Sequence, residues 1–196
     1  MSLHVNHVPI IDCYGSIRKG APAILLDRDG VLNENRSEHV LRSSDVRVIG
    51  SSLDAMRLAD NLGFALLIAT NQACISDGAV SLDAVMAMTR KIADEASGGV
   101  IAAAAICPHA RDAGCSCRKP RPGLLRVLHS RFQFDLERSV FVGDASTDAD
   151  AAIAAGIQPI VVRTGRWNGS EELPSLTVVR DDLAAAISFA IDRVAT

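Results

Sequence analysis

The chain has 196 residues, 48% of them hydrophobic and 22% charged, a balance that predicts one globular domain and argues against disorder. Its formal net charge of −3 offers no basic excess for neutralising phosphates, so we expect no nucleic-acid partner. No apolar run approaches the ~20 residues of a membrane span, and residues 1–15 lack the pattern of a secretory leader. We therefore expect a cytoplasmic monomer that does not bind membranes.

Apolar runs of strand length alternate with amphipathic stretches along the chain. Residues 1–20 are polar and aperiodic, and we treat them as an extension of unassigned role. The first helix between strands is expected to begin near Ser51 or Ser52 and to stop at Gly63. Apolar residues at helical spacing predict two further helices, around 124–132 and 183–191. The expected strands are 23–26, 64–69, 100–106, 139–142, 159–162 and 177–179.

The expected strands barely alternate between apolar and polar residues. This is typical of strands that are covered on both faces, as in a parallel sheet with helices on each side. Because the composition does not change along residues 21–196, we predict a single doubly wound α/β domain there, of the Rossmann-like kind. In such sheets the ligand site lies beyond the carboxyl ends of the strands.

Polar side chains follow three of the predicted strands, and a lysine precedes the helix that leads to the third. Because the carboxyl ends of parallel strands meet at one edge, we expect these side chains to lie close together. The residues are Asp27 and Asp29, Thr70 and Asn71, Asp144 and Asp148, and Lys119.

Such a group of carboxylates requires a compensating charge. A hard cation such as Mg²⁺ supplies it and also binds phosphate oxygens, while an ammonium and a hydroxyl can hold the remaining oxygens. One aspartate could attack phosphorus, and the other, two residues away, could protonate the leaving oxygen and later activate water. In an extended segment the side chains of Asp27 and Asp29 point to the same side. These residues predict a Mg²⁺-dependent phosphoryl-transfer site.

The motifs DRDGVLN, TNQ, CRKPRPG and GDASTD, in this order and at these separations, resemble those of the haloacid dehalogenase (HAD) superfamily of phosphatases. The resemblance covers about residues 21–165 and implies a core without a large cap domain. It implies that Asp27 is the nucleophile, that Asp29 is the general acid and base, and that Thr70 and Lys119 bind the phosphoryl group. The implied Mg²⁺ ligands are Asp27, the backbone carbonyl of Asp29, and Asp144, with Asp148 as a further ligand or a support.

Within the superfamily the chain is most similar to the heptose-bisphosphate phosphatases, with the histidinol-phosphate phosphatases as near relatives. The implied substrate is a phosphorylated sugar, preferably a bisphosphate. Two segments depart from the pattern of these relatives: the loop ACISDG after TNQ, and residues 34–45, which we expect to line the substrate entrance. Histidinol phosphate or another phosphorylated sugar therefore stays open as the substrate.

A second pattern, CPHARDAGCSC, has the composition of a Cys₃His zinc site, with one ligand pair spaced C-x-H and the other C-x-C. Four protein ligands leave no open position for water, which indicates a structural ion. The resemblance implies the same, a zinc loop that substitutes for a cap domain. The ligands would be Cys107, His109, Cys115 and Cys117.

Arg118 lies between the last of these ligands and Lys119. A guanidinium can bind phosphate through two parallel hydrogen bonds, and Lys119 already serves the reacting phosphoryl group. We therefore expect Arg118 to hold a second phosphate, which favours a bisphosphate substrate.

Two other classes of protein share part of these features. A phospho-receiver domain also gathers aspartates, a threonine and a lysine at the end of a parallel sheet, but its phosphorylated aspartate follows a later strand and it has no zinc loop. A zinc-binding interaction module would leave the aspartates unexplained. A phosphatase is the interpretation that uses both patterns.

Overall fold

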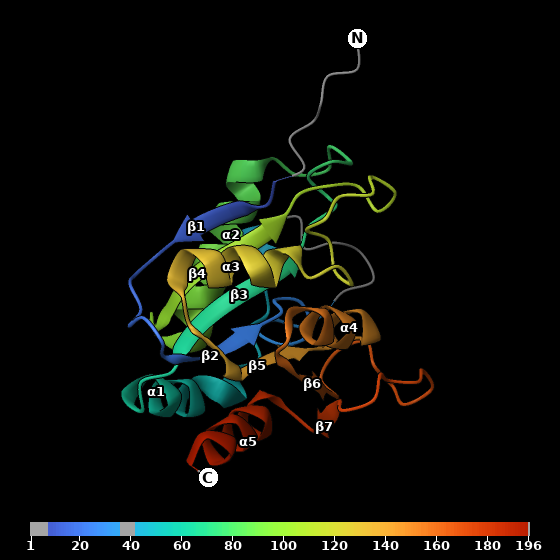
Figure 1. Cartoon of the computed structure of the whole chain (residues 1–196). Coiled ribbons are helices and arrows are strands. Elements are labelled where there is room, and N and C mark those ends of the chain that lie inside the picture. The colour runs from blue at the N-terminus through green and yellow to red at the C-terminus, as the bar shows by residue number, and fades with distance from the viewer. Residues whose placement is uncertain (1–7, 36–41, 196) are drawn as a thin grey trace.

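The computed structural model describes residues 8–35 and 42–195, which are built around a seven-stranded sheet in the order β1-β4-β3-β2-β5-β6-β7 (Figure 1). Strands β2 to β7 are parallel, and β1 pairs antiparallel with β4. This confirms the predicted α/β fold with a mostly parallel sheet. The strands are β1 Ile10–Cys13, β2 Pro22–Leu26, β3 Ala65–Asn71, β4 Ile101–Cys107, β5 Asp135–Gly143, β6 Gln158–Val162 and β7 Val178–Arg180.

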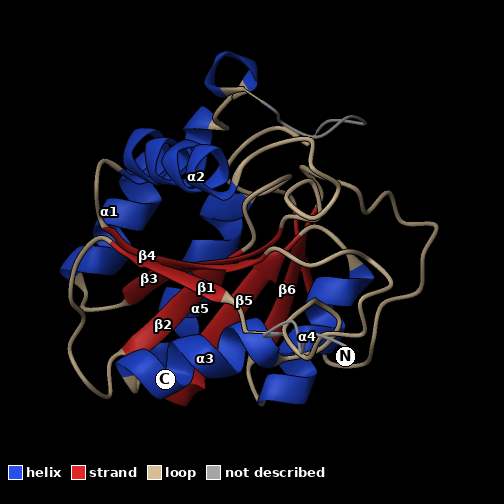
Figure 2. Ribbon diagram, turned by 90° about the horizontal axis from the view of Figure 1, so that it is seen from above, coloured by secondary structure: helices blue, strands red, loops and turns tan. Residues whose placement is uncertain are grey.

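Helices cover both faces of the sheet, and Figure 2 shows α2 and α3 on opposite sides of it. On one face α1, α2 and α5 pack on one buried apolar cluster, and on the other face α3 and α4 pack on a second. Strands β2 and β4 are buried throughout, which explains why their sequences do not alternate. The helices are α1 Leu53–Asn61, α2 Leu82–Ser97, α3 Gly123–Phe132, α4 Ser146–Ala155 and α5 Leu183–Ala195.

Strand β1 is not among the strands predicted from the sequence. It pairs with β4 from Ile10 opposite Ile106 to Cys13 opposite Ala103, so part of segment 1–20 joins the sheet as an edge strand. The Asp12 carboxylate accepts a hydrogen bond of 2.9 Å from Arg90 Nη2 on α2. The strand has only four residues, one of them the charged Asp12, so it is too short to show the alternation of apolar and polar residues by which strands are predicted.

The predicted element boundaries differ from the observed ones by one or two residues, except in β5 and at the end of α5, which continues to Ala195. Strand β5 begins at Asp135, whereas the sequence predicts a start at Ser139. The first four residues are polar or only partly buried, so they do not belong to the apolar run on which the prediction rests. The 3₁₀ helices are η1 Ser43–Asp45 and η2 Gly50–Ser52, and η2 runs directly into α1. Gly63, with φ +85°, follows the end of α1 as predicted.

Among the helices of residues 8–35 and 42–195, none has both the length and the apolarity that crossing a membrane requires. The parallel order aligns the carboxyl ends of β2 to β6 along one edge of the sheet. Of the segment 34–45, expected at the substrate entrance, residues 36–41 lie outside the described residues.

Candidate active site

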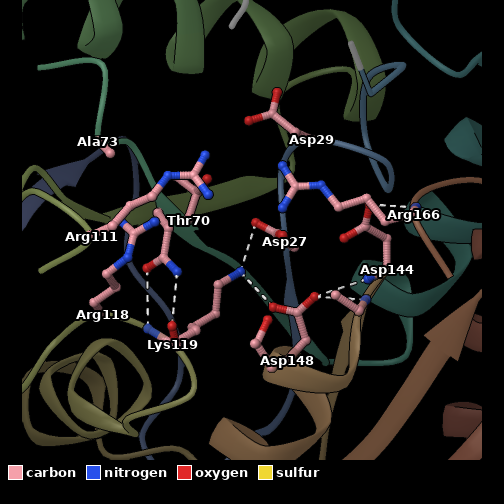
Figure 3. Close-up of a pocket in the computed structure, with 13 residues that line it drawn as sticks. Asp27, Asp29, Thr70, Ala73, Arg111, Arg118, Lys119, Asp144, Asp148 and Arg166 are labelled. Carbon is pink, nitrogen blue, oxygen red and sulfur yellow. Dashed lines mark hydrogen bonds and ion pairs between the residues drawn. The ribbon is translucent and has the colours of Figure 1, made fainter. Parts of the chain in front are cut away.

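The ammonium of Lys119 lies between two carboxylates at the carboxyl edge of the sheet (Figure 3). Its Nζ is 2.9 Å from Asp27 Oδ1 and 2.7 Å from Asp148 Oδ1, and it donates a third bond, of 3.1 Å, to the carbonyl of Ala69. Asp27 is 9% exposed, Lys119 5% and Asp148 2%. The fold thus brings together residues that follow β2, precede α3 and begin α4, as the sequence predicts.

Burial shapes the charge state of this cluster. Burial, joined by the carboxylates of Asp148 and Asp144, raises the pKa of Asp27 to about 7 against the opposing effect of Lys119. Burial alone would lower the pKa of Lys119, but Asp148 and Asp27 outweigh it, so that this pKa is raised and the lysine stays charged. The pKa of Asp144 is also raised, first by burial and then by Asp148.

Three carboxylates in this cluster, Asp27, Asp144 and Asp148, each offer an oxygen within 4.8 Å of the others. The single ammonium of Lys119 contacts two of these three carboxylates, so it cannot compensate all of their negative charge. A divalent cation with oxygen ligands would do so, and the donor set fits Mg²⁺.

The Asp148 carboxylate is already engaged on both oxygens. Oδ1 faces Lys119, while Oδ2 accepts hydrogen bonds from the backbone N–H groups of Asp144 (3.0 Å) and Ala145 (3.1 Å). Asp148 is therefore better placed to support Lys119 and the β5–α4 turn than to bind an ion directly.

Gly30, the glycine of the DRDG motif, permits a close approach to Asp144. Its φ is +87°, and a Cβ atom added to it would lie 2.2 Å from Asp144 Oδ2. Gly165, after β6, faces the same oxygen, and a Cβ atom there would also lie at 2.2 Å. No side chain fits at either position unless Asp144 moves.

The Asp29 carboxylate lines the same cavity as Asp27 but points away from it in Figure 3. Arg28 Nη2 is 2.9 Å from both of its oxygens, and Asn33 Nδ2 and Gln72 Nε2 each donate at 2.9 Å. Burial would raise the pKa of Asp29, but the Arg28 charge and the bonds from Asn33, Arg28 and Gln72 outweigh it and lower this pKa. Asp29 is therefore held as a carboxylate.

The two predicted polar residues at the end of β3 differ in their contacts. Thr70 is buried and lines the cavity. Asn71 also lines it, but its side-chain amide exchanges two hydrogen bonds of 3.2 Å with the backbone N–H and carbonyl of Lys119. Asn71 thus braces the segment that carries the lysine.

Three arginines line the cavity around the carboxylates: the predicted Arg118, together with Arg111 and Arg166. Arg111 belongs to the loop after β4, and Arg166 approaches from the opposite side in Figure 3, from the segment after β6. Sequence reasoning missed both. A signal was present for Arg166, because it closely follows a predicted strand at the edge where the site was expected.

The zinc-loop residues form a compact buried cluster, as predicted. The sulfur–sulfur distances are 3.4 Å from Cys117 to Cys107, 3.6 Å from Cys117 to Cys115 and 3.7 Å from Cys107 to Cys115. His109 Nδ1 lies 3.2 Å from Cys117 Sγ and 3.5 Å from Cys107 Sγ. A tetrahedron with Zn–S bonds of about 2.3 Å has S–S edges of about 3.8 Å, so the cluster fits a zinc ion.

Hydrogen bonds tie the cluster to the cavity. Within the cluster, the hydrogen bond from the Cys117 thiol is the largest of the effects that lower the pKa of Cys107 to about 5. The thiolate, which is the form that binds metal ions, is therefore favoured at Cys107. Arg121 Nη1 donates to the carbonyl of Cys115 at 2.6 Å, and Arg118 Nη1 donates to that of His109 at 3.4 Å. The cluster therefore fixes the loop from which Arg118 and Lys119 extend.

The fold and the aspartate–lysine site define a phosphatase of the HAD-like hydrolase class, and the HAD-hydrolase-like family matches residues 116–186. D-glycero-β-D-manno-heptose-1,7-bisphosphate 7-phosphatases from Pseudomonas putida and Pseudomonas aeruginosa are 38% and 36% identical, over 83% and 84% of this chain and 95% of each relative. The chain belongs to the family of these phosphatases. The crystal structure of the D,D-heptose 1,7-bisphosphate phosphatase from B. bronchiseptica, complexed with magnesium and phosphate, has a TM-score of 0.78 and 34% identity over 87% of this chain and 98% of that one.

Proposed function

We propose that this chain removes the 7-phosphate of D-glycero-β-D-manno-heptose 1,7-bisphosphate in a Mg²⁺-dependent reaction. The observation that carries the proposal is the Asp27–Lys119–Asp148 cluster in a cavity that three arginines line. The names of the relatives support this substrate, since the similarity to this chain extends over 95% of the length of each relative.

In the first step Asp27 attacks phosphorus, the bond between phosphorus and the sugar oxygen breaks, and Asp29 donates a proton to that oxygen. In the second step water attacks the aspartyl-phosphate, Asp29 takes its proton, and inorganic phosphate leaves. Asp29 enters the first step protonated, and the proton that it takes from water in the second step restores this state. The donors around Asp29 favour its carboxylate form, so they favour release of the proton to the sugar oxygen and leave the carboxylate that the second step uses. Lys119 and the Thr70 hydroxyl hold the oxygens of the phosphoryl group in both steps.

Asp27, Asp144 and the backbone carbonyl of Asp29 would hold the Mg²⁺, with Asp148 supporting Lys119. When bound, the ion neutralises negative charge on the phosphoryl oxygens. We also propose a structural Zn²⁺ held by Cys107, His109, Cys115 and Cys117, whose distances fit a tetrahedral ion.

The arginines account for the second phosphate. Lys119 is engaged with Asp27 and Asp148, whereas Arg111 and Arg118 line the cavity from the zinc loop. Guanidinium groups recognise phosphate through two parallel hydrogen bonds, and energy from a remote phosphate can orient the reacting end of the sugar. A bisphosphate uses this arrangement, while a monophosphate such as histidinol phosphate does not.

The experiment that tests this function measures phosphate release from heptose 1,7-bisphosphate, sugar monophosphates and histidinol phosphate, with Mg²⁺ and with a chelator. The expected result is the highest kcat/KM with the heptose bisphosphate and loss of activity without Mg²⁺. A higher kcat/KM with histidinol phosphate would contradict the proposed substrate.

Replacing Arg118 with alanine should affect the two kinds of substrate unequally. Loss of a charged hydrogen bond to phosphate is expected to lower kcat/KM by about 10- to 100-fold with the bisphosphate. With a sugar monophosphate the loss should stay below about threefold, because the remote contact is never made. Steady-state kinetics with both substrates measure this.

The matched control is Arg131→Ala, at an exposed arginine on α3, which should leave both values unchanged. An equal bisphosphate-to-monophosphate ratio in wild type and Arg118→Ala would show that Arg118 does not bind the second phosphate.

We further propose a monomer in the cytoplasm, with no nucleic-acid or membrane partner, and a phosphatase domain over residues 21–196. The net charge of −3 argues against a nucleic-acid partner. Cysteine thiolates that serve as metal ligands favour a reducing compartment such as the cytoplasm.

A further inference from the structure

The side-chain amide of Gln72 connects two residues of the site. Gln72 is 3% exposed, and its Nε2 lies 2.9 Å from Asp29 Oδ2 and 3.0 Å from Thr70 Oγ1. An amide nitrogen carries two N–H groups, so each of them has one acceptor here. On the other side, the thiol of the buried Cys74 donates to Gln72 Oε1 at 3.6 Å.

These partners determine which way the amide faces. With the amide reversed, Oε1 would lie against the Asp29 carboxylate, and two acceptors would face each other at 2.9 Å in a buried place. The carboxylate character of Asp29 is secured independently by Arg28 and Asn33. The nitrogen must therefore face Thr70, and the Thr70 hydroxyl must accept a hydrogen bond from it.

A threonine hydroxyl that accepts at its oxygen still has one hydrogen to donate. Thr70 lies at the end of β3 and lines the cavity with Asp27 and Lys119. Within residues 8–35 and 42–195 this hydrogen has no acceptor, while a phosphoryl group in the cavity offers only acceptors.

We propose that Gln72 is a positioning residue that commits the Thr70 hydroxyl to donate to the phosphoryl group. Without the amide the hydroxyl can rotate freely, and a smaller fraction of it points at the phosphate. Asp29 acts as the anchor that orients the amide. This inference rests on the proposed phosphatase function of the site.

The test is a double-mutant cycle between Gln72→Met and Thr70→Val, read by calorimetric binding of inorganic phosphate in the presence of Mg²⁺. In the wild-type background, Gln72→Met should raise the Kd for phosphate about tenfold, because a charge-assisted hydrogen bond is weakened. In the Thr70→Val background the same change should raise it less than about threefold. Thr70→Ser is the matched control, since it keeps the hydroxyl and should keep the sensitivity to Gln72→Met.

Thermal melts establish that each variant is folded. If Gln72→Met does not fold, Gln72→Glu replaces it; its carboxylate adds repulsion in both backgrounds but captures the hydroxyl hydrogen only where Thr70 is present. If Gln72→Met raised the Kd for phosphate by the same factor in both backgrounds, Gln72 would act only on the structure, and the inference would be overturned. It would also be overturned by a wild type that binds no phosphate.

Turnover separates this inference from the proposed function. Phosphate release from the heptose bisphosphate is measured on the same preparations. A wild type that binds phosphate with the expected coupling, yet releases none from any sugar phosphate, would overturn the proposed function and leave the role of Gln72 standing.

Discussion

Replacing Asp27 with asparagine is expected to abolish phosphate release. Uncatalysed hydrolysis of phosphate monoesters is among the slowest reactions known, with enzymatic accelerations of up to about 10²¹-fold, so a site without its nucleophile retains little of this acceleration. Asparagine keeps the size of the side chain but cannot form the acyl phosphate. We expect kcat to fall by at least about 10⁴-fold, measured as phosphate release from the heptose bisphosphate.

The matched control is Asp83→Asn, at an exposed aspartate in the first turn of α2, which should leave kcat unchanged. Mass spectrometry should accompany the assay, because deamidation of the new asparagine would restore Asp27. A kcat near the wild-type value in undeamidated protein would show that Asp27 is not the nucleophile.

Replacing Cys117 with serine is expected to remove zinc and destabilise the protein. The side chain lies within 3.6 Å of both other cysteines and of His109, at the centre of the cluster, and a structural zinc site contributes its binding energy to folding. We expect a loss of several kcal/mol, which corresponds to a fall in Tm of about 10 °C or more. Activity should fall as well, since the loop from which Lys119 extends loses its anchor.

Metal analysis and thermal melts measure this effect. Cys13→Ser is the matched control, because Cys13 is exposed and belongs to the edge strand β1. Wild type and Cys13→Ser should each contain one zinc per chain, and Cys117→Ser less than about one tenth of that. Wild-type protein purified under reducing conditions without chelators, yet free of zinc, would contradict the site.

Some of the electrostatics could not be predicted from the sequence. Arg28 stands between Asp27 and Asp29 in the motif, yet only the structure shows its guanidinium buried against Asp29. The two aspartates line the same cavity, as predicted, but their carboxylates have different hydrogen-bonding and ion-pair partners. The carboxylate of Asp27 faces Lys119, and that of Asp29 is held by neutral amides and an arginine.

The parallel strands, the aspartates, Thr70 and Lys119 at their carboxyl edge, and the Cys/His loop could be predicted from the sequence, because each depends on local patterns. Unbroken apolar runs indicate strands buried on both faces, and a parallel sheet aligns their ends, so Asp27, Thr70 and Asp144 had to meet at one edge. Likewise, three cysteines and a histidine at zinc-ligand spacing within eleven residues hardly depend on the rest of the fold.

Other features depend on contacts between segments that are distant in the sequence, and these could be seen only in the folded chain. The edge strand β1 is too short for a period of two to appear, and its place beside β4 follows from pairing across 90 residues or more. Arg166 lines the cavity from the segment after β6, and Gln72, next to Thr70 in the chain, contacts Asp29 across 43 residues. Side-chain direction at such sites depends on packing between elements, and no local pattern encodes it.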